Sequence, residues 1–159
     1  MIEIQRLQEN FSLIRRCVEW TASEFGDKIG VSKMTISNIE TKRYPLTKIQ
    51  YIAIRSVLDA EIAKNQDDTQ MLAVLLDLLV DNPDNYKDSE KKELLSKANL
   101  ISPSILAGTA TRKEVSKEWI SVATKISGAA LTVLSDPIVV RAVGSWIYKT
   151  ISQKKGGKI

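Results

Sequence analysis

Apolar residues recur at helical spacing along most of this chain. The first set predicts one helix over residues 4–18, ending near Trp20, because its members are separated by alternating steps of three and four. The apolar stripe of this helix consists of Ile4, Leu7, Phe11, Ile14 and Val18. Two shorter helical patterns follow in residues 21–29 and 32–41, and a longer one begins near residue 47.

Two glycines mark the join between the two short patterns. Helices that meet at a steep angle need a small residue where they cross and a backbone free to take positive φ at the turn. Gly26, one helical turn before the join, supplies the first, and Gly30 supplies the second. Ile36 and Ile39 share one face of the following helix. The spacing therefore predicts a helix-turn-helix over residues 21–40.

Helix-start signals support these boundaries. Thr21 with Glu24, and Thr47 with Gln50, have the spacing of a capping box, in which each side chain satisfies a free backbone N–H of the other residue. Ser32 is placed to be the N-cap of the third helix. A further helical segment is expected to start within residues 59–64. The expected buried face of the fourth helix consists of Ile49, Ile52, Ala53, Val57 and Leu58.

The second half of the chain is also helical in pattern. A polar linker at residues 65–68 places a domain boundary between residues 64 and 65. Beyond it we expect helices over residues 71–80, 89–100 and 112–134, and a last helix that starts at residues 136–137. The chain is thus predicted to be all-α, with a four- to five-helix domain at residues 1–64 and a C-terminal helical bundle or oligomerisation region at residues 65–159.

Composition argues against most catalytic chemistry. The 159 residues include no histidine, which removes the commonest general base, the commonest zinc ligand and the usual partner of a serine or cysteine nucleophile. The sequence also lacks a Gly-rich phosphate loop, a Cys-x-x-Cys pair and a Gly-x-Ser-x-Gly elbow. We therefore expect neither an enzyme nor a bound metal or cofactor.

The net charge of +4 is unevenly distributed. It is +2 over residues 1–64, −4 over residues 65–110 and +6 over residues 111–159. A basic balance favours polyanionic partners, but the helix-turn-helix segment is only modestly basic. Any DNA affinity of this segment must therefore come from where its charges are placed.

Two features bear on location. No stretch approaches the roughly 20 apolar residues of a membrane-spanning helix, and the N-terminus lacks the basic segment followed by an apolar segment that marks a secretory signal. The single cysteine, Cys17, lies within the first helical pattern, as is typical of a buried thiol rather than a reactive one. A cytoplasmic protein without membrane partners is expected.

Residues 5–60 resemble the helix-turn-helix domain of the XRE family, the Cro and phage-lambda-repressor-like DNA-binding domains. The resemblance is carried, in register, by Phe25, Gly26, Gly30, Val31, Ser32, Ile36, Ile39 and Glu40. It also implies a structural ion pair between Arg15 and Glu40. One position departs from the family: Ala22 stands where a glutamine commonly reaches a phosphate, which leaves Ser23 or free helix-start N–H groups for that contact.

The same resemblance implies that the helix over residues 32–41 enters the major groove of DNA. Three side chains would then face base edges: Lys33, Met34 and Asn38. Lysine can donate to guanine, methionine can pack on a thymine methyl, and asparagine can pair with adenine. Thr35 and Ser37 are better placed for phosphates or flanking edges, and residues 41–43 for the backbone, without sequence preference. The full set expected at the DNA interface is Ser32, Lys33, Met34, Thr35, Ser37, Asn38, Thr41, Lys42 and Arg43.

The C-terminal half allows three interpretations. Domains of this kind gain affinity as symmetric dimers on half-sites about 34 Å apart. A coiled-coil-like seam of apolar residues at steps of three and four, over residues 115–133, offers an interface for a homodimer. In the second interpretation, the seam and the last helix form the core of a monomeric bundle. A third treats residues 138–155 as an amphipathic helix on a membrane surface. The candidate oligomerisation residues are Val115, Trp119, Val122, Ile126 and Trp146.

Two functions remain open at this stage. One is a sequence-specific transcriptional regulator, more specifically a repressor, whose N-terminal domain binds operator DNA. The other is an antitoxin or mobile-element immunity protein that acts mainly through protein or peptide contacts of residues 70–159. The two are separable, because only the first requires selective binding to particular duplex sequences.

Overall fold

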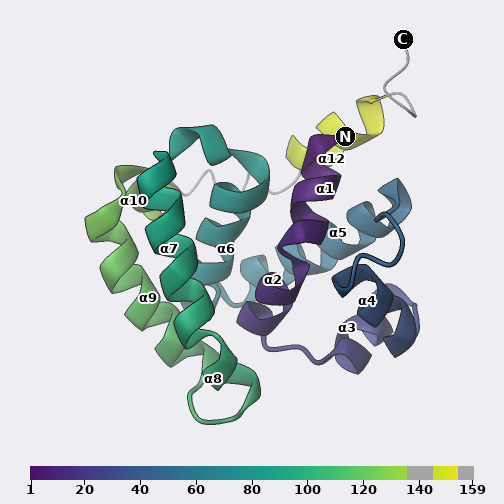
Figure 1. Ribbon diagram of the computed structural model, residues 1–159, viewed down its shortest axis with the longest axis horizontal. Helices are drawn as coiled ribbons and strands as arrows, with labels where there is room; N and C mark the ends of the chain where they lie inside the picture. The colour runs from purple at the N-terminus through teal and green to yellow at the C-terminus, as the bar shows by residue number, and fades with distance from the viewer. Residues whose placement is uncertain (136–144, 154–159) are drawn as a thin grey trace.

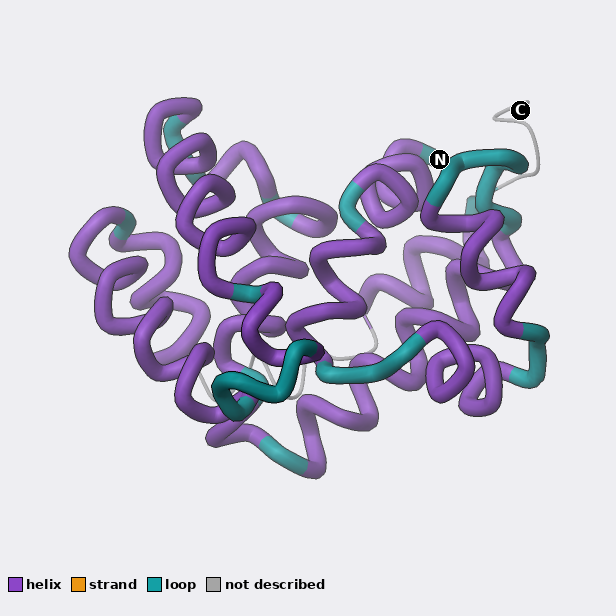
Figure 2. The backbone as a smooth tube through the Cα atoms, turned by 60° about the horizontal axis from the view of Figure 1, so that its bottom comes forward, coloured by secondary structure: helices purple, strands orange, loops and turns teal. Residues whose placement is uncertain are grey.

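The computed structural model of the chain describes residues 1–135 and 145–153, and every regular element in these ranges is a helix (Figures 1 and 2). The all-α prediction is therefore confirmed for the described residues. The expected start of the last helix, at residues 136–137, lies outside them. The α-helices are α1 (Ile2–Glu9), α2 (Phe11–Val18), α3 (Ala22–Ile29), α4 (Lys33–Glu40), α5 (Lys48–Lys64), α6 (Gln70–Leu76), α7 (Asp88–Ile101), α8 (Pro103–Leu106), α9 (Arg112–Ile126), α10 (Gly128–Ser135) and α12 (Ser145–Ser152).

The first apolar stripe is divided between two helices rather than carried by one. Asn10 leaves the helical conformation, with φ −111° and ψ 9°. Its side-chain amide donates to the Arg6 carbonyl at 2.9 Å, a local bond by which asparagine competes with helical backbone pairing. The stripe itself continues across the break, since Leu7 and Phe11 are both fully buried. The pattern predicted the buried face correctly and its continuity wrongly.

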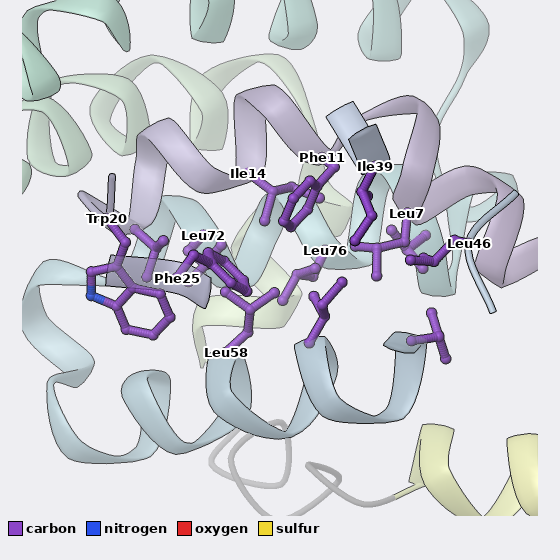
Figure 3. Close-up of a cluster of buried hydrophobic side chains, with 14 of the residues drawn as sticks. Leu7, Phe11, Ile14, Trp20, Phe25, Ile39, Leu46, Leu58, Leu72 and Leu76 are labelled. Carbon is purple, nitrogen blue, oxygen red and sulfur yellow. The ribbon is translucent and has the colours of Figure 1, made fainter. Parts of the chain in front are cut away.

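The first hydrophobic cluster contains residues from each of the five helices α1 through α5, together with Leu72 and Leu76 from α6 (Figure 3). At its centre, the ring of Phe25 packs edge-to-face against Phe11 at 5.0 Å and against Trp20 at 5.2 Å between ring centroids. This packing fixes α3 on α2. The α2–α3 packing thus rests on a buried aromatic cluster.

A second cluster lies between α6, α7, α9 and α10 and also takes in Leu13 and Cys17 from α2. Burial raises the pKa of the Cys17 thiol to about 12, so this thiol stays protonated at neutral pH. Helix α6 contributes side chains to both clusters. Apolar packing therefore connects residues on either side of the expected boundary at 64/65.

The buried face of helix α5 is only partly the one expected. Leu58 is fully buried as predicted, and Ile52, Ala53 and Val57 are half-buried. Ile49 is instead 79% exposed, and Tyr51 and Ile54 are fully buried together with the nearly buried Arg55. The Arg55 guanidinium donates to both carboxylate oxygens of Asp81, at 2.6 and 2.9 Å. A buried guanidinium costs far less when a carboxylate pairs with it than when it stands alone, so Arg55 can lie on the inward face. The helix also runs unbroken to Lys64, and the expected new start within residues 59–64 is wrong.

The long helix expected over residues 112–134 is interrupted at Ser127. This residue is extended, with φ −137° and ψ 126°, and the chain resumes as α10 from Gly128. In α9, Val115 and Trp119 are only 2% and 1% exposed. The indole N–H of Trp119 donates to the Leu94 carbonyl at 3.2 Å. The seam therefore packs against α7 within the chain itself.

The candidate oligomerisation residues need correction on this point. Val115, Trp119 and Trp146 are buried in the chain's own two clusters, so their side chains are not available to a partner in this conformation. Val122 and Ile126 are half-buried. The interpretation of these residues as the interior of a bundle fits this burial. A homodimer stays a prediction, and of the five candidate residues only Val122 and Ile126 keep exposed surface for it.

Helix α12 docks on the N-terminal half through polar and aromatic contacts. The Trp146 ring lies edge-to-face on Tyr51 with 5.7 Å between centroids, and its N–H donates to Asp59. Lys149 of the same helix pairs with Glu3 in α1. Burial raises the pKa of the Asp59 carboxyl above its ordinary value, although the Arg55 charge and the Trp146 hydrogen bond act in the opposite direction.

A second polar clamp involves Arg112 at the start of α9. Its guanidinium donates to the Val18 carbonyl at 3.0 Å, to Glu61 at 2.9 Å and to Asp68 at 2.9 Å. These partners belong to α2, α5 and the expected linker, so the second half of the chain is tied to the first by directed hydrogen bonds. Within the described ranges, no helix combines the length and the apolar character needed to cross a bilayer.

Candidate nucleic-acid interface

The crossing of α3 and α4 depends on two glycines used in different ways. At Gly26, a Cβ would lie only 2.6 Å from the Val31 carbonyl oxygen, so no larger residue fits without moving the backbone. At Gly30, the backbone has φ 77° and ψ 31°, the left-handed conformation that glycine adopts without steric cost. The Val31 N–H donates to the Gly26 carbonyl at 2.9 Å and closes the turn. Both expected roles are present.

Side-chain caps set the start of each helix in this region. The Thr21 hydroxyl accepts from the Glu24 N–H at 3.1 Å, and the Glu24 carboxylate accepts from the Thr21 N–H at 3.3 Å. The Ser32 hydroxyl accepts from the Thr35 N–H at 3.1 Å. These bonds satisfy N–H groups that have no partner inside the helix. The starts of α3 and α4 are thus fixed locally, as the sequence predicted.

The ion pair between Arg15 and Glu40 is present. The Arg15 Nε donates to one carboxylate oxygen of Glu40, and Nη2 donates to the other at 3.2 Å. A third donor, Nη1, reaches the Trp20 carbonyl at 3.1 Å. Both side chains are largely shielded, at 14% and 18% exposed. This two-pronged pair fixes the end of α4 against α2.

Helix α4 has one buried face and one free face. Ile36 and Ile39 are 0% and 4% exposed, whereas Lys33 is exposed and Met34 is 67% exposed. Asn38 is half-buried and lines a shallow cleft. Figure 1 shows α4 at one side of the molecule, with α7, α9 and α10 at the other. The face of α4 that carries Lys33 and Met34 is therefore open to solvent.

The hydroxyl groups expected at this interface are mostly engaged in the fold. The Thr35 hydroxyl lies 3.1 Å from that of Ser32, within the N-cap. The Thr41 hydroxyl donates to the Ser37 carbonyl at 3.0 Å. Thr41 remains exposed and Ser37 is half-buried. These groups can still meet a phosphate, but their first partners are within the chain.

The turn after α4 carries two exposed cations, Lys42 and Arg43. Lys42 has φ 58°, a left-handed conformation that is uncommon for a residue with a side chain. Arg43 is also exposed, and its guanidinium carbon lies 5.9 Å from the centre of the Tyr44 ring. The amine of Lys48, at the start of α5, instead donates to the Gln153 carbonyl at 2.9 Å. Lys42 and Arg43 are thus the cations offered by the turn.

Two large apolar side chains at this site were not among the sequence-predicted residues. Tyr44 is 60% exposed, and Ile49 at the first turn of α5 is 79% exposed. Tyr44 also borders the shallow cleft beside Asn38, which has a volume of about 280 Å³ and is lined by Thr47 and Gln50 as well. Helical periodicity had placed Ile49 on a buried face.

Ala22, where the resemblance led us to expect glutamine, is half-buried and packs against the first hydrophobic cluster. Its methyl group reaches no polar partner. Ser23 beside it is exposed at the start of α3. Any phosphate contact at this position falls to Ser23 or to the backbone N–H groups of the first helical turn.

Comparisons with protein-family models, with curated proteins and with solved structures found no match for this chain.

Proposed function

We propose that this chain is a sequence-specific DNA-binding protein, a transcriptional regulator and more specifically a repressor, that inserts α4 into the major groove. The observation that carries the proposal is the division of α4 into two faces. Its isoleucines are buried, its Lys33 and Met34 are free, and a glycine-built crossing with α3 holds it in place. The major groove is about 12 Å wide and admits an α-helix that presents an exposed face to it.

The residue types on this face have distinct roles in the proposal. Asn38 pairs with adenine through its side-chain amide, whose nitrogen donates to the base and whose oxygen accepts from it. Lys33 donates to guanine, and Met34 packs on a thymine methyl. Lys42 and Arg43 contact phosphates and contribute affinity without sequence preference. The chemistry is binding alone, so no reaction is assigned to the chain. Pairing of two copies would place two such helices on half-sites one turn of DNA apart.

Selection of bound duplexes from a random pool tests this function. The full chain should enrich a defined sequence, and a palindromic consensus would report a dimer as well as the site. A duplex that carries the consensus should then bind more tightly than an unrelated duplex of equal length. Absence of any enriched sequence would overturn the proposal and favour the alternative, in which the chain acts through protein contacts.

The phosphate contacts are tested by removing both cations of the turn. The double substitution Lys42→Ala and Arg43→Ala should weaken binding to the consensus and unrelated duplexes by a similar factor and lower the salt slope by about one to two. The matched control removes two exposed lysines of α9, by Lys113→Ala and Lys117→Ala, for the same loss of charge. An equal effect of the two pairs would mean that net charge, rather than its placement, provides the affinity.

A further inference from the structure

A side chain of α1, distant in the sequence, bonds the turn that carries the two cations. Gln8 of α1 donates from its amide nitrogen to the Tyr44 carbonyl at 2.7 Å and to the Ile39 carbonyl at 3.2 Å. Its amide oxygen accepts from the Leu46 N–H at 2.9 Å. One amide group thus bonds the end of α4, the middle of the turn and the approach to α5.

The residues between these bonds have few contacts of their own with the core. Residues 41–45, including Tyr44, are all exposed, and Lys42 holds a left-handed backbone that its side chain disfavours. Leu46, which ends the turn, is 6% exposed and belongs to the first hydrophobic cluster with Leu7 and Ile39 (Figure 3). Backbone bonds continue from α4 into the turn, since the N–H groups of Lys42 and Arg43 donate to the Ile39 and Asn38 carbonyls at 3.2 and 3.0 Å. Leu46 holds the far end of the turn in the core, and Gln8 is the side chain that bonds the stretch between them.

An amide is the one side-chain group that meets this set of partners. The two carbonyls need a donor and the Leu46 N–H needs an acceptor, and glutamine supplies both from one planar group. A carboxylate of the same shape would accept from Leu46 but would set a negative charge against two carbonyl oxygens. An alanine would leave all three backbone groups without this partner. Glutamic acid and alanine therefore disrupt the same anchor in two different ways.

We infer that Gln8 is a positioning residue for DNA binding: without touching DNA, it presets the 41–46 turn so that Lys42 and Arg43 meet the phosphates that flank the site read by α4. The inference rests on the proposed function and assigns it a residue outside the helix-turn-helix. A turn already ordered before binding loses less conformational freedom when its cations contact the duplex. Loss of the anchor should therefore act on backbone affinity and not on sequence preference.

The test compares Gln8→Ala and Gln8→Glu with Gln5→Ala, a matched change at an exposed glutamine of the same helix. Affinity is measured in the full chain for the consensus duplex and an unrelated duplex, over a range of salt concentrations. Both Gln8 variants should bind both duplexes about three- to tenfold more weakly. Their salt slopes should fall towards that of the Lys42→Ala, Arg43→Ala double variant. Gln5→Ala should match the wild type.

Two further readouts separate positioning from general damage to the fold. Amide hydrogen exchange in the free chain should be faster at Leu46 in the Gln8 variants and unchanged at core amides such as Phe25. Adding Gln8→Ala to the Lys42→Ala, Arg43→Ala pair should weaken binding little further, because the cations it positions are gone. Fully multiplicative losses, or wild-type affinity of both Gln8 variants, would overturn the inference alone. A wild-type chain that binds no duplex would overturn the proposed function and the inference with it.

Discussion

Replacing Gly26 by alanine tests the tight crossing of α3 and α4 on which the interface depends. In a helix interior this change usually stabilises by about 1 kcal/mol, because alanine has the higher helix propensity. Here the new Cβ would lie 2.6 Å from the Val31 carbonyl oxygen and 3.3 Å from backbone atoms of Ser32. Overpacking against atoms that cannot rotate away costs about 1 to 3 kcal/mol, with the upper part of that range expected against backbone.

The expected net result for Gly26→Ala is a loss of about 1 to 2 kcal/mol of unfolding free energy, which lowers Tm by roughly 2 to 8 °C in a chain of this size. Thermal and urea unfolding followed by circular dichroism measure both quantities. Binding to the consensus duplex should weaken as well, since α4 must shift on α3.

Two other glycines provide the controls. A Cβ at Gly128, the first residue of α10, meets nothing within 4 Å, so Gly128→Ala should leave stability unchanged or raise it. A Cβ at Gly30 also meets nothing, but its φ of 77° should cost about 1 to 2 kcal/mol for alanine. If Gly26→Ala proved as stable as Gly128→Ala, the close approach of the two helices described here would be refuted.

Three further substitutions test the supports of the interface and of α12. Arg15→Ala should lower the unfolding free energy by about 1 to 3 kcal/mol, because it leaves the Glu40 carboxylate shielded and unpaired. Urea unfolding of Arg15→Ala, Glu40→Ala and the double variant measures the coupling between the two residues, and purely additive losses would count against the pair. Ser32→Ala should cost about 1 kcal/mol through loss of the N-cap, and no change in urea midpoint would exclude that role. Because the pKa of Asp59 is raised, the native state binds the carboxyl proton more tightly than the unfolded chain does. The wild type should therefore lose stability relative to Asp59→Asn as the pH rises above 3.8, the ordinary pKa of this carboxyl. Urea unfolding from pH 4 to pH 7 checks this, and a difference that does not vary with pH would contradict the burial of the ionised group.

Local signals in the sequence were sufficient to predict the helices α3 and α4 and the turn between them. The capping boxes, the roles of Gly26 and Gly30 and the buried isoleucines of α4 depend on residues close together in the chain, and each is present in the structure. Short-range periodicity and capping chemistry determine such features directly. Recognition of a family resemblance added the Arg15 to Glu40 pair, which no local pattern indicates.

The features that the sequence did not reveal depend on partners distant in the chain. Arg55 of helix α5 is buried because Asp81 pairs with its guanidinium and the Trp146 ring packs against it. Periodicity alone predicts that a charged residue is exposed. The seam on α9 had two open interpretations because an apolar stripe does not specify which helix covers it. The hydrogen bonds of Gln8 reach backbone groups 31 to 38 residues away, and no pattern of residue types along the sequence predicts them.

Discrimination between duplexes by Asn38 tests most directly the central claim that α4 reads base edges. The measurement is the ratio of affinities for the consensus duplex and an unrelated duplex, for the wild type, Asn38→Ala and Asn85→Ala, the last at an exposed asparagine in the 3-10 turn Pro83–Asn85. Loss of a two-pronged contact to adenine should cost Asn38→Ala about 1 to 3 kcal/mol on the consensus duplex only. Asn85→Ala should match the wild type on both duplexes. An unchanged affinity ratio for Asn38→Ala would contradict base reading by α4 at this position.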